Sequence, residues 1–214
     1  MKKFIVSVPI LVCLVLPVLA AVVEGLEPLE PEFAHRFGKI LSDEADKIAK
    51  PQIKVAADPD KANGLHVPHK VGVLVVPQKE LKESEELAAK FKTEKGASLA
   101  YLFLYNLVPV IDGQPVDPSR LHTVELADDQ WSKHKVYLLL LAVRQLSDDD
   151  YRLHAYGHAE KPLLDAKFSE GAGSGSDPVG VEVKDVNEAT HQGKLVLTVF
   201  GKYQASFTCG HKAD

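Results

Sequence analysis

LAYLFLYNLV at residues 99–108 and VYLLLLAV at residues 136–143 are the two stretches of sequence that decide the fold. Successive side chains of a β-strand point to opposite faces of the sheet, so a stretch that is apolar at nearly every position is apolar on both faces. This pattern is typical of a strand that is covered on both sides. The two stretches therefore predict central strands, each buried on both faces.

Shorter segments on either side of these stretches alternate between apolar and polar residues or are rich in β-branched residues, as strands are. Turn signals such as Asp112-Gly113 and Asp117-Pro118 separate them. Many short strands with turns between them predict a mainly β fold, an antiparallel two-sheet β-sandwich that is immunoglobulin-like in general shape. The further strands that we expect are residues 53–57, 71–76, 121–126, 151–156, 162–168, 179–186, 195–200 and 203–207.

Two segments before residue 99 have the spacing of helices instead. In residues 78–94 the apolar positions fall near one side, and charge pairs such as Glu86–Lys90 suit an exposed helix face. Residues 32–49 carry apolar residues at roughly helical spacing, and Pro51 ends that pattern. We therefore expect one helix over 78–94 and a weaker one over 32–49.

The first twenty residues have the features of a secretory signal peptide. Lys2 and Lys3 precede a long apolar run, and small or compact residues before Ala21 fit a cleavage site. An uncleaved membrane anchor is the alternative, because the apolar character continues to Val23. Two prolines inside the run disfavour an unbroken spanning helix, so we favour cleavage.

The rest of the chain is long enough for one domain. We expect a signal peptide at residues 1–20, an extended lead-in at 21–31, a single β-rich globular domain at 32–208 and a C-terminal tail at 209–214. The short Lys-Lys start and the absence of a glycosylation sequon favour a bacterial protein, periplasmic or secreted.

Composition excludes several classes of function. The formal net charge is −5, which argues against a nucleic-acid partner. After signal cleavage no apolar run is long enough to span a membrane, and no phosphate-binding glycine loop indicates a cofactor. Cleavage also leaves Cys209 without a second cysteine, so the domain must hold together by packing alone.

Histidines are the first candidates for chemistry, because nine are many for this length. His154 and His158 are the candidate metal ligands, since i,i+4 spacing would place both rings on one face of a helix. Gly157 and the expected strand argue against a helix, and an extended strand would hold the two residues about 12 Å or more apart. A turn at Gly157 would shorten that distance. Further candidates are His66, His69 and Cys209.

Aromatic residues are the candidates for ligand binding. Trp131 lies in a polar segment, where a lone tryptophan can stack on a sugar ring, anchor a protein partner, or fill the end of the sandwich. If their loops meet, Trp131, Tyr151 and Tyr156 would form one aromatic patch.

No motif indicates catalysis, since Gly173-Ser-Gly-Ser176 lacks the spacing of a nucleophile turn. We therefore expect an exported, non-catalytic binding or structural module that engages a protein or glycan partner through its loops. Two alternatives stay open. One is a periplasmic protein that binds metal through histidines, and the other is a hydrolase whose carboxylates meet only in space.

Overall fold

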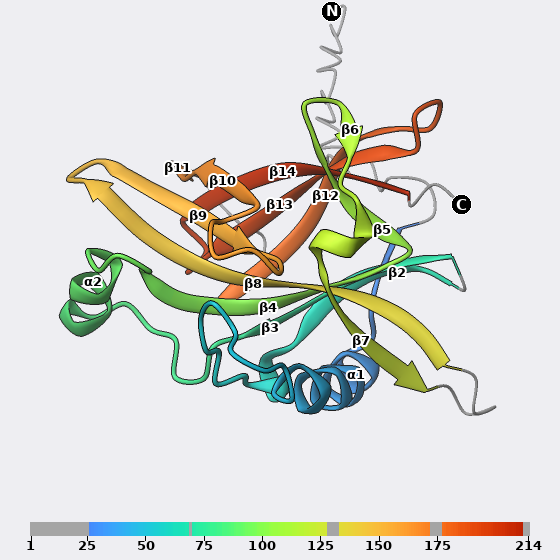
Figure 1. Ribbon diagram of the computed structural model, residues 1–214, viewed down its shortest axis with the longest axis horizontal. Helices are drawn as coiled ribbons and strands as arrows, with labels where there is room; N and C mark the ends of the chain where they lie inside the picture. Colours follow the sequence, from blue (N-terminus) through green and yellow to red (C-terminus); the bar gives the residue numbers. More distant parts are fainter. Residues whose placement is uncertain (1–25, 69, 128–132, 172–176, 212–214) are drawn as a thin grey trace, which may run out of the picture.

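The computed structural model describes residues 26–68, 70–127, 133–171 and 177–211. It shows a mainly β protein built from two antiparallel sheets stacked as a sandwich (Figure 1). This confirms the predicted fold class. The strands are β1 (Glu27–Pro28), β2 (Asn63–Val67), β3 (Val71–Pro77), β4 (Ala97–Tyr105), β5 (Leu107–Ile111), β6 (Gln114–Pro115), β7 (His122–Ala127), β8 (Lys133–Ser147), β9 (Asp150–Tyr156), β10 (Leu164–Lys167), β11 (Ser169–Glu170), β12 (Val179–Asn187), β13 (Gln192–Val199) and β14 (Tyr203–His211).

The larger sheet has eight strands in the order β1-β2-β3-β4-β8-β9-β10, and β7 pairs with the first half of β8. The smaller sheet has six strands in the order β12-β13-β14-β5-β6, with β11 paired to the start of β14. Of the two stretches predicted to be central, residues 99–108 form most of β4 and the start of β5, and residues 136–143 form the middle of β8. β4 and β8 do pair at the centre of the larger sheet.

Both faces of β4 and β8 are buried, as the two-faced apolar pattern predicts. Side chains such as Leu102, Leu139 and Leu141 point between the sheets, into the core shared with the smaller sheet. Side chains such as Phe103 and Leu138 point the other way, into a second core under the first helix. The larger sheet is therefore the middle layer of three.

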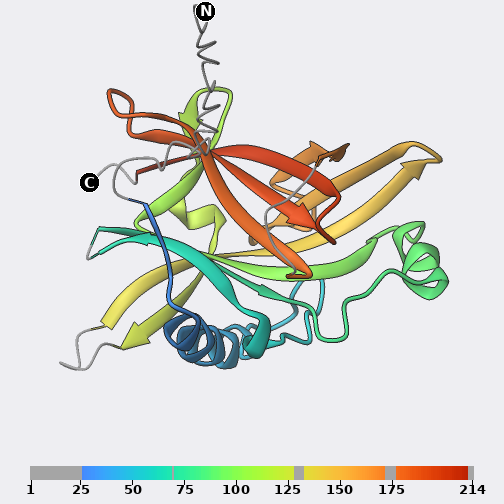
Figure 2. The same ribbon diagram turned by 180° about the vertical axis from the view of Figure 1, so that it is seen from behind.

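The helix α1 (Pro31–Ala45) forms the outer layer and lies across the larger sheet on the side away from the smaller one (Figures 1 and 2). Pro31 fits the first turn of a helix, where a backbone N–H has no partner to lose. The helix ends at Asp46, whose carboxylate accepts a hydrogen bond of 2.8 Å from the Tyr101 hydroxyl. It is therefore shorter than the 32–49 expected, because the chain tightens after Ala45 into turns in which the Lys47 and Ile48 amides donate to the Glu44 and Ala45 carbonyls.

The helix α2 (Glu85–Phe91) is much shorter than the 78–94 expected. Ser84 caps its first turn by accepting a hydrogen bond of 3.1 Å from the Leu87 amide. Before it, Glu80 has a φ of 57°, a conformation that a helix excludes. Two 3₁₀ turns complete the helical elements of the described residues, η1 (Pro59–Lys61) and η2 (Pro118–Arg120).

The predicted strand at residues 99–108 is two strands in two sheets. Asn106 separates β4 from β5 with a φ of 54°, a left-handed conformation that asparagine tolerates better than most residues. Its side-chain amide donates a hydrogen bond of 2.7 Å to the Lys70 carbonyl, which fixes the turn. The chain thereby crosses from the larger sheet to the smaller one.

Two further boundaries differ from those expected. Residues 53–57 are not a strand but a segment with one isolated bridge, between Ala57 and Gln78. The expected tail at 209–214 is wrong at its start, because β14 continues to His211 and Cys209 is buried in it. Across the described ranges, no helix has the length and apolar character needed to cross a membrane.

Candidate functional site

A cleft with a volume of about 690 Å³ opens on the outer face of the larger sheet, over β8, β9 and β10. The helix α1 packs on β2, β3 and β7 and leaves this part of the face uncovered. Strand residues form the floor, namely Arg144, Leu146, His154, Tyr156 and Asp165. Loop residues form the walls, including Lys50, Gln52, Glu94, Lys95, Glu160 and Lys161.

Strand alternation explains why these floor residues meet. Across the β8–β9 pair, Ala142 lies opposite His154 and Arg144 lies opposite Arg152. Asp165 of β10 lies opposite His154 on its other side. Because residues directly opposite each other share a face, these polar side chains continue the face that is apolar under α1.

His154 is the most buried polar group of the cleft, at 4% exposed. Its Nδ1 lies 3.4 Å from the Tyr156 hydroxyl, and its Nε2 lies 3.7 Å from an Asp165 carboxylate oxygen. That same oxygen accepts a hydrogen bond of 2.8 Å from Arg152 Nε. The floor therefore carries a connected row of polar groups on a face that elsewhere is packed with apolar side chains.

Arg144 differs from its neighbour Arg152. Arg152 lies within ion-pair distance of both Asp150 and Asp165. Arg144 forms no ion pair with any residue that the structure describes, although Arg152 stands directly opposite it. The charge of Arg152 is compensated by these two carboxylates, whereas that of Arg144 is not. Arg144 is therefore the strongest indication that the cleft binds an anion.

Gln52 joins the cleft to a histidine pair beside it. The Gln52 Nε2 donates a hydrogen bond of 2.8 Å to the His158 carbonyl, and its Oε1 lies 3.1 Å from His122 Nε2. The rings of His122 and His158 meet edge to face, with centroids 4.4 Å apart. Lys95 Nζ donates a hydrogen bond of 3.3 Å to the Gln52 carbonyl. Gln52 thus links its own segment to the segments that carry Lys95 and His158, and these three segments form the walls of the cleft.

Stability is expected to decrease as the pH falls from 7.5 to 5.5. Burial lowers the pKa of both His154 and His122 below the ordinary value of 6.5. Asp165 opposes that effect at His154 and the two facing arginines, Arg144 and Arg152, reinforce it. At His122 the neighbouring His158 reinforces it and a hydrogen bond to Gly157 opposes it. In this range the unfolded chain therefore binds more protons than the native protein. The free energy of unfolding decreases as the pH is lowered, until the pH is below the native pKa values of the two histidines.

Urea unfolding at several pH values measures this dependence. The double variant His122→Gln with His154→Gln is expected to lose most of the slope between pH 7.5 and 5.5. His191→Asn is the control, because His191 is exposed in a turn with a φ of 50° that asparagine tolerates. A slope that the double variant keeps in full would contradict the assignment.

The structure separates the aromatic residues expected to form one patch. Tyr156 lies in the cleft, whereas Tyr151 lies in a groove on the opposite face of β9. The two are five residues apart, and an odd separation along a strand places side chains on opposite faces. Trp131 lies outside the described residues.

The expected metal ligands also occupy different surroundings. His154 is buried in β9, while His158 is exposed after Gly157 and packs on His122. His66 lies in β2 and His69 lies outside the described residues. Burial raises the pKa of the Cys209 thiol to about 12, so it stays protonated. Within the described ranges no three His, Cys, Asp or Glu side chains are grouped to hold a metal ion.

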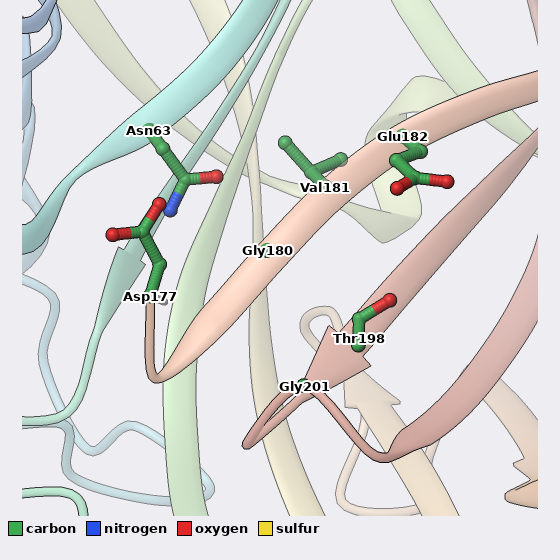
Figure 3. Close-up of a pocket in the computed structure, with 7 residues that line it drawn as sticks. All are labelled: Asn63, Asp177, Gly180, Val181, Glu182, Thr198 and Gly201. Carbon is green, nitrogen blue, oxygen red and sulfur yellow. The ribbon is translucent and has the colours of Figure 1, made fainter. Parts of the chain in front are cut away.

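A smaller pocket of about 220 Å³ lies where β12 closes against β2 (Figure 3). Its polar groups hold the sandwich together: Asn63 Nδ2 donates a hydrogen bond of 2.7 Å to the Val179 carbonyl, which joins β2 to β12. Gln204 Nε2 donates to the Thr198 hydroxyl at 3.3 Å and joins β14 to β13. We therefore interpret this pocket as part of the contact between strands and not as a ligand site.

A scan against protein-family models, a search of curated proteins and a search of solved structures each give no match. Sequence analysis found His154 and Tyr156 but missed Arg144 and Asp165. The sequence did contain a signal for Arg144. Leu140, Ala142 and Arg144 occupy alternate positions of one strand and so share a face, and Arg144 places a charge on a face that is otherwise apolar.

Proposed function

We propose that this protein is an exported, non-catalytic binding module that takes an acidic glycan into the cleft on the outer face of the larger sheet. The observation that carries the proposal is Arg144, a floor residue without an ion-pair partner among the described residues and directly opposite a second arginine. Arginine binds carboxylate and sulfate groups through two parallel N–H donors. A uronate or sulfate group on a sugar would fit this position.

The charges around the cleft support an anionic ligand. Its cationic lining residues are Arg144, Lys50, Lys95 and Lys161, and its carboxylates are Glu94, Glu160 and Asp165. The residues that line the cleft therefore carry four cations against three carboxylates, one formal positive charge in excess. The whole chain has the opposite sign, with a formal net charge of −5. A positive cleft on a protein of negative net charge attracts an anion to that cleft, whereas the protein as a whole repels anions.

The other polar groups suit sugar hydroxyls. The Tyr156 hydroxyl, the His154 ring and the Gln52 amide offer both donors and acceptors within one cleft. The volume of about 690 Å³ lies in the range of small-molecule sites. Tyr156 is only 5% exposed, so recognition by stacking is not part of the proposal. Export is supported by the leader-like first twenty residues, with Ala21 as the proposed mature start.

Calorimetry with the mature protein tests the proposal, after mass spectrometry has established its first residue. The probes are a trigalacturonate, a sulfated trisaccharide, and the trigalacturonate with its carboxyls converted to methyl esters. We expect an acidic probe to bind and the esterified form to bind at least about tenfold more weakly. Arg144→Gln is expected to weaken acidic binding by about 1.5–3 kcal/mol, which is roughly tenfold to a hundredfold.

Arg120→Gln is the matched control. Arg120 is an exposed arginine of η2 that does not line the cleft, so its loss is expected to leave binding within about twofold. Equal binding of the esterified probe, unchanged binding in Arg144→Gln, or no binding of either acidic probe would each reject the proposal.

The hydrolase remains the second candidate, because Glu94, Glu160 and Asp165 line the same cleft as His154. Two carboxylates flanking a bond are what glycoside hydrolysis requires. The same incubations therefore include an assay for new reducing ends, which we expect to find absent. Release of reducing ends that Glu160→Gln abolishes would make the protein an enzyme.

A further inference from the structure

The helix α2 and the β8–β9 hairpin lie at the same end of the molecule (Figure 1). Residues of both line a second concave surface, on the other face of β9 from the cleft. It has a volume of about 480 Å³. Both sheets contribute to it, with Val143 and Tyr151 from the larger and Val199 and Tyr203 from the smaller. We call it the end groove.

The floor of the end groove is apolar and continuous with the core between the sheets. Phe168 and Val199 belong to that core and are buried. Phe91 of α2 meets Tyr151 edge to face, with ring centroids 6.0 Å apart. Leu87 is half-buried, and α2 has no buried residue at all. The floor can therefore accept an apolar side chain against aromatic rings.

The rim of the end groove is acidic. Its carboxylates belong to Glu83, Asp149 and Glu170. Glu83 receives Lys202 Nζ at 2.9 Å, so that charge is compensated. Asp149 and Glu170 form no ion pair with any residue in the described parts of the chain. Two of the three rim carboxylates are therefore uncompensated within the described parts of the chain.

We propose that the end groove binds an extended segment of a partner protein in which basic residues flank one or two large apolar side chains. The apolar side chains enter the floor beside Phe91 and Tyr151, and the flanking lysines or arginines face Asp149 and Glu170. Charge complementarity selects this occupant: an acidic segment would face two uncompensated carboxylates, and a purely apolar one would leave them without partners. The site is independent of the proposed glycan cleft.

Fluorescence anisotropy with labelled peptides tests this site on the whole mature protein. The probe is Gly-Lys-Arg-Leu-Phe-Leu-Lys-Arg-Gly, compared with one peptide in which Glu replaces every basic residue and another in which Ser replaces Leu and Phe. We expect both replacements to weaken binding by about tenfold or more. Added salt is expected to weaken binding of the basic peptide, because the rim carboxylates are exposed.

Neighbouring alanines of α2 give a matched pair of variants. Ala88 lines the end groove and Ala89 does not, although both are exposed. Ala88→Arg, which adds bulk and positive charge, is expected to weaken peptide binding by about tenfold, and Ala89→Arg to leave it within about twofold. Both positions are exposed, so we expect both variants to fold. Melting temperatures equal to that of the unchanged protein would establish this.

Equal binding of the acidic peptide, equal effects of the two arginine variants, or no peptide binding would overturn the proposal. Self-association of the chain that Ala88→Arg abolishes would assign the end groove to a second copy instead. Arg144→Gln is expected to leave peptide binding unchanged, and Ala88→Arg to leave saccharide binding unchanged. Failure of one site is therefore distinguishable from failure of the other.

Discussion

Leu139→Ala is expected to lower the free energy of unfolding by about 3 kcal/mol. Leu139 lies near the middle of β8, is 0% exposed and faces Leu102 of β4 in the core between the sheets. Truncation removes buried methyl groups and leaves a cavity that close-packed neighbours fill only in part. For a domain of this size the melting temperature is expected to fall by roughly 6–12 °C.

Urea unfolding with Leu146→Ala as the control measures this effect. Leu146 is in the same strand but is 50% exposed, so the identical truncation is expected to change stability by no more than about 0.5 kcal/mol. If both variants lost the same stability, β8 would not be the centre of the core.

Gly157→Ala is expected to destabilise the protein by about 2–3 kcal/mol and to disturb the cleft. A Cβ at residue 157 would overlap the carbonyl oxygen of Arg120. That oxygen also accepts a hydrogen bond of 2.9 Å from the His158 amide, so the two segments cannot separate without losing it. The segments carry His122 and His158, whose ring contact should therefore shift.

Thermal unfolding and the NMR signals of the histidine rings give the two readouts for this variant. Gly180→Ala is the control, because a Cβ at Gly180 of β12 meets no atom within 4 Å. Its stability is expected to stay the same or to rise slightly, by less than about 1 kcal/mol. A Gly157→Ala protein with normal stability and unshifted histidine signals would contradict the prediction, because the backbone around residue 157 would then accommodate a Cβ without cost.

Sequence patterns predicted the parts of this fold that depend on local alternation. Both doubly apolar stretches became central strands, because a side chain's face follows from its position along a strand whatever its partner. The boundaries were less accurate where one residue carries an unusual backbone conformation. Asn106 and Glu80 have positive φ values that no hydrophobic pattern reveals, and they divide a predicted strand and shorten a predicted helix.

The candidate site was only partly accessible to sequence reasoning. The opposite faces of Tyr151 and Tyr156 follow from their odd separation, so this error was avoidable. The place of Asp165 beside His154 was not predictable, because it depends on the register between β9 and β10. The same holds for Gln52, which reaches His122 across seventy residues of chain.

The position of β14 has a consequence for how the protein folds. Within the smaller sheet β14 pairs with β13 on one side and with β5 on the other, although residues as distant in sequence as His211 and Leu107 are then opposite each other. β5 therefore gains this neighbour only through a contact between distant parts of the chain, which is slow to form because a long loop must close first. Until then the inter-sheet face of β4 and β8 lacks the part of its cover that Ala205, Phe207 and Cys209 of β14 supply, so we expect the core between the sheets to close only when β14 docks.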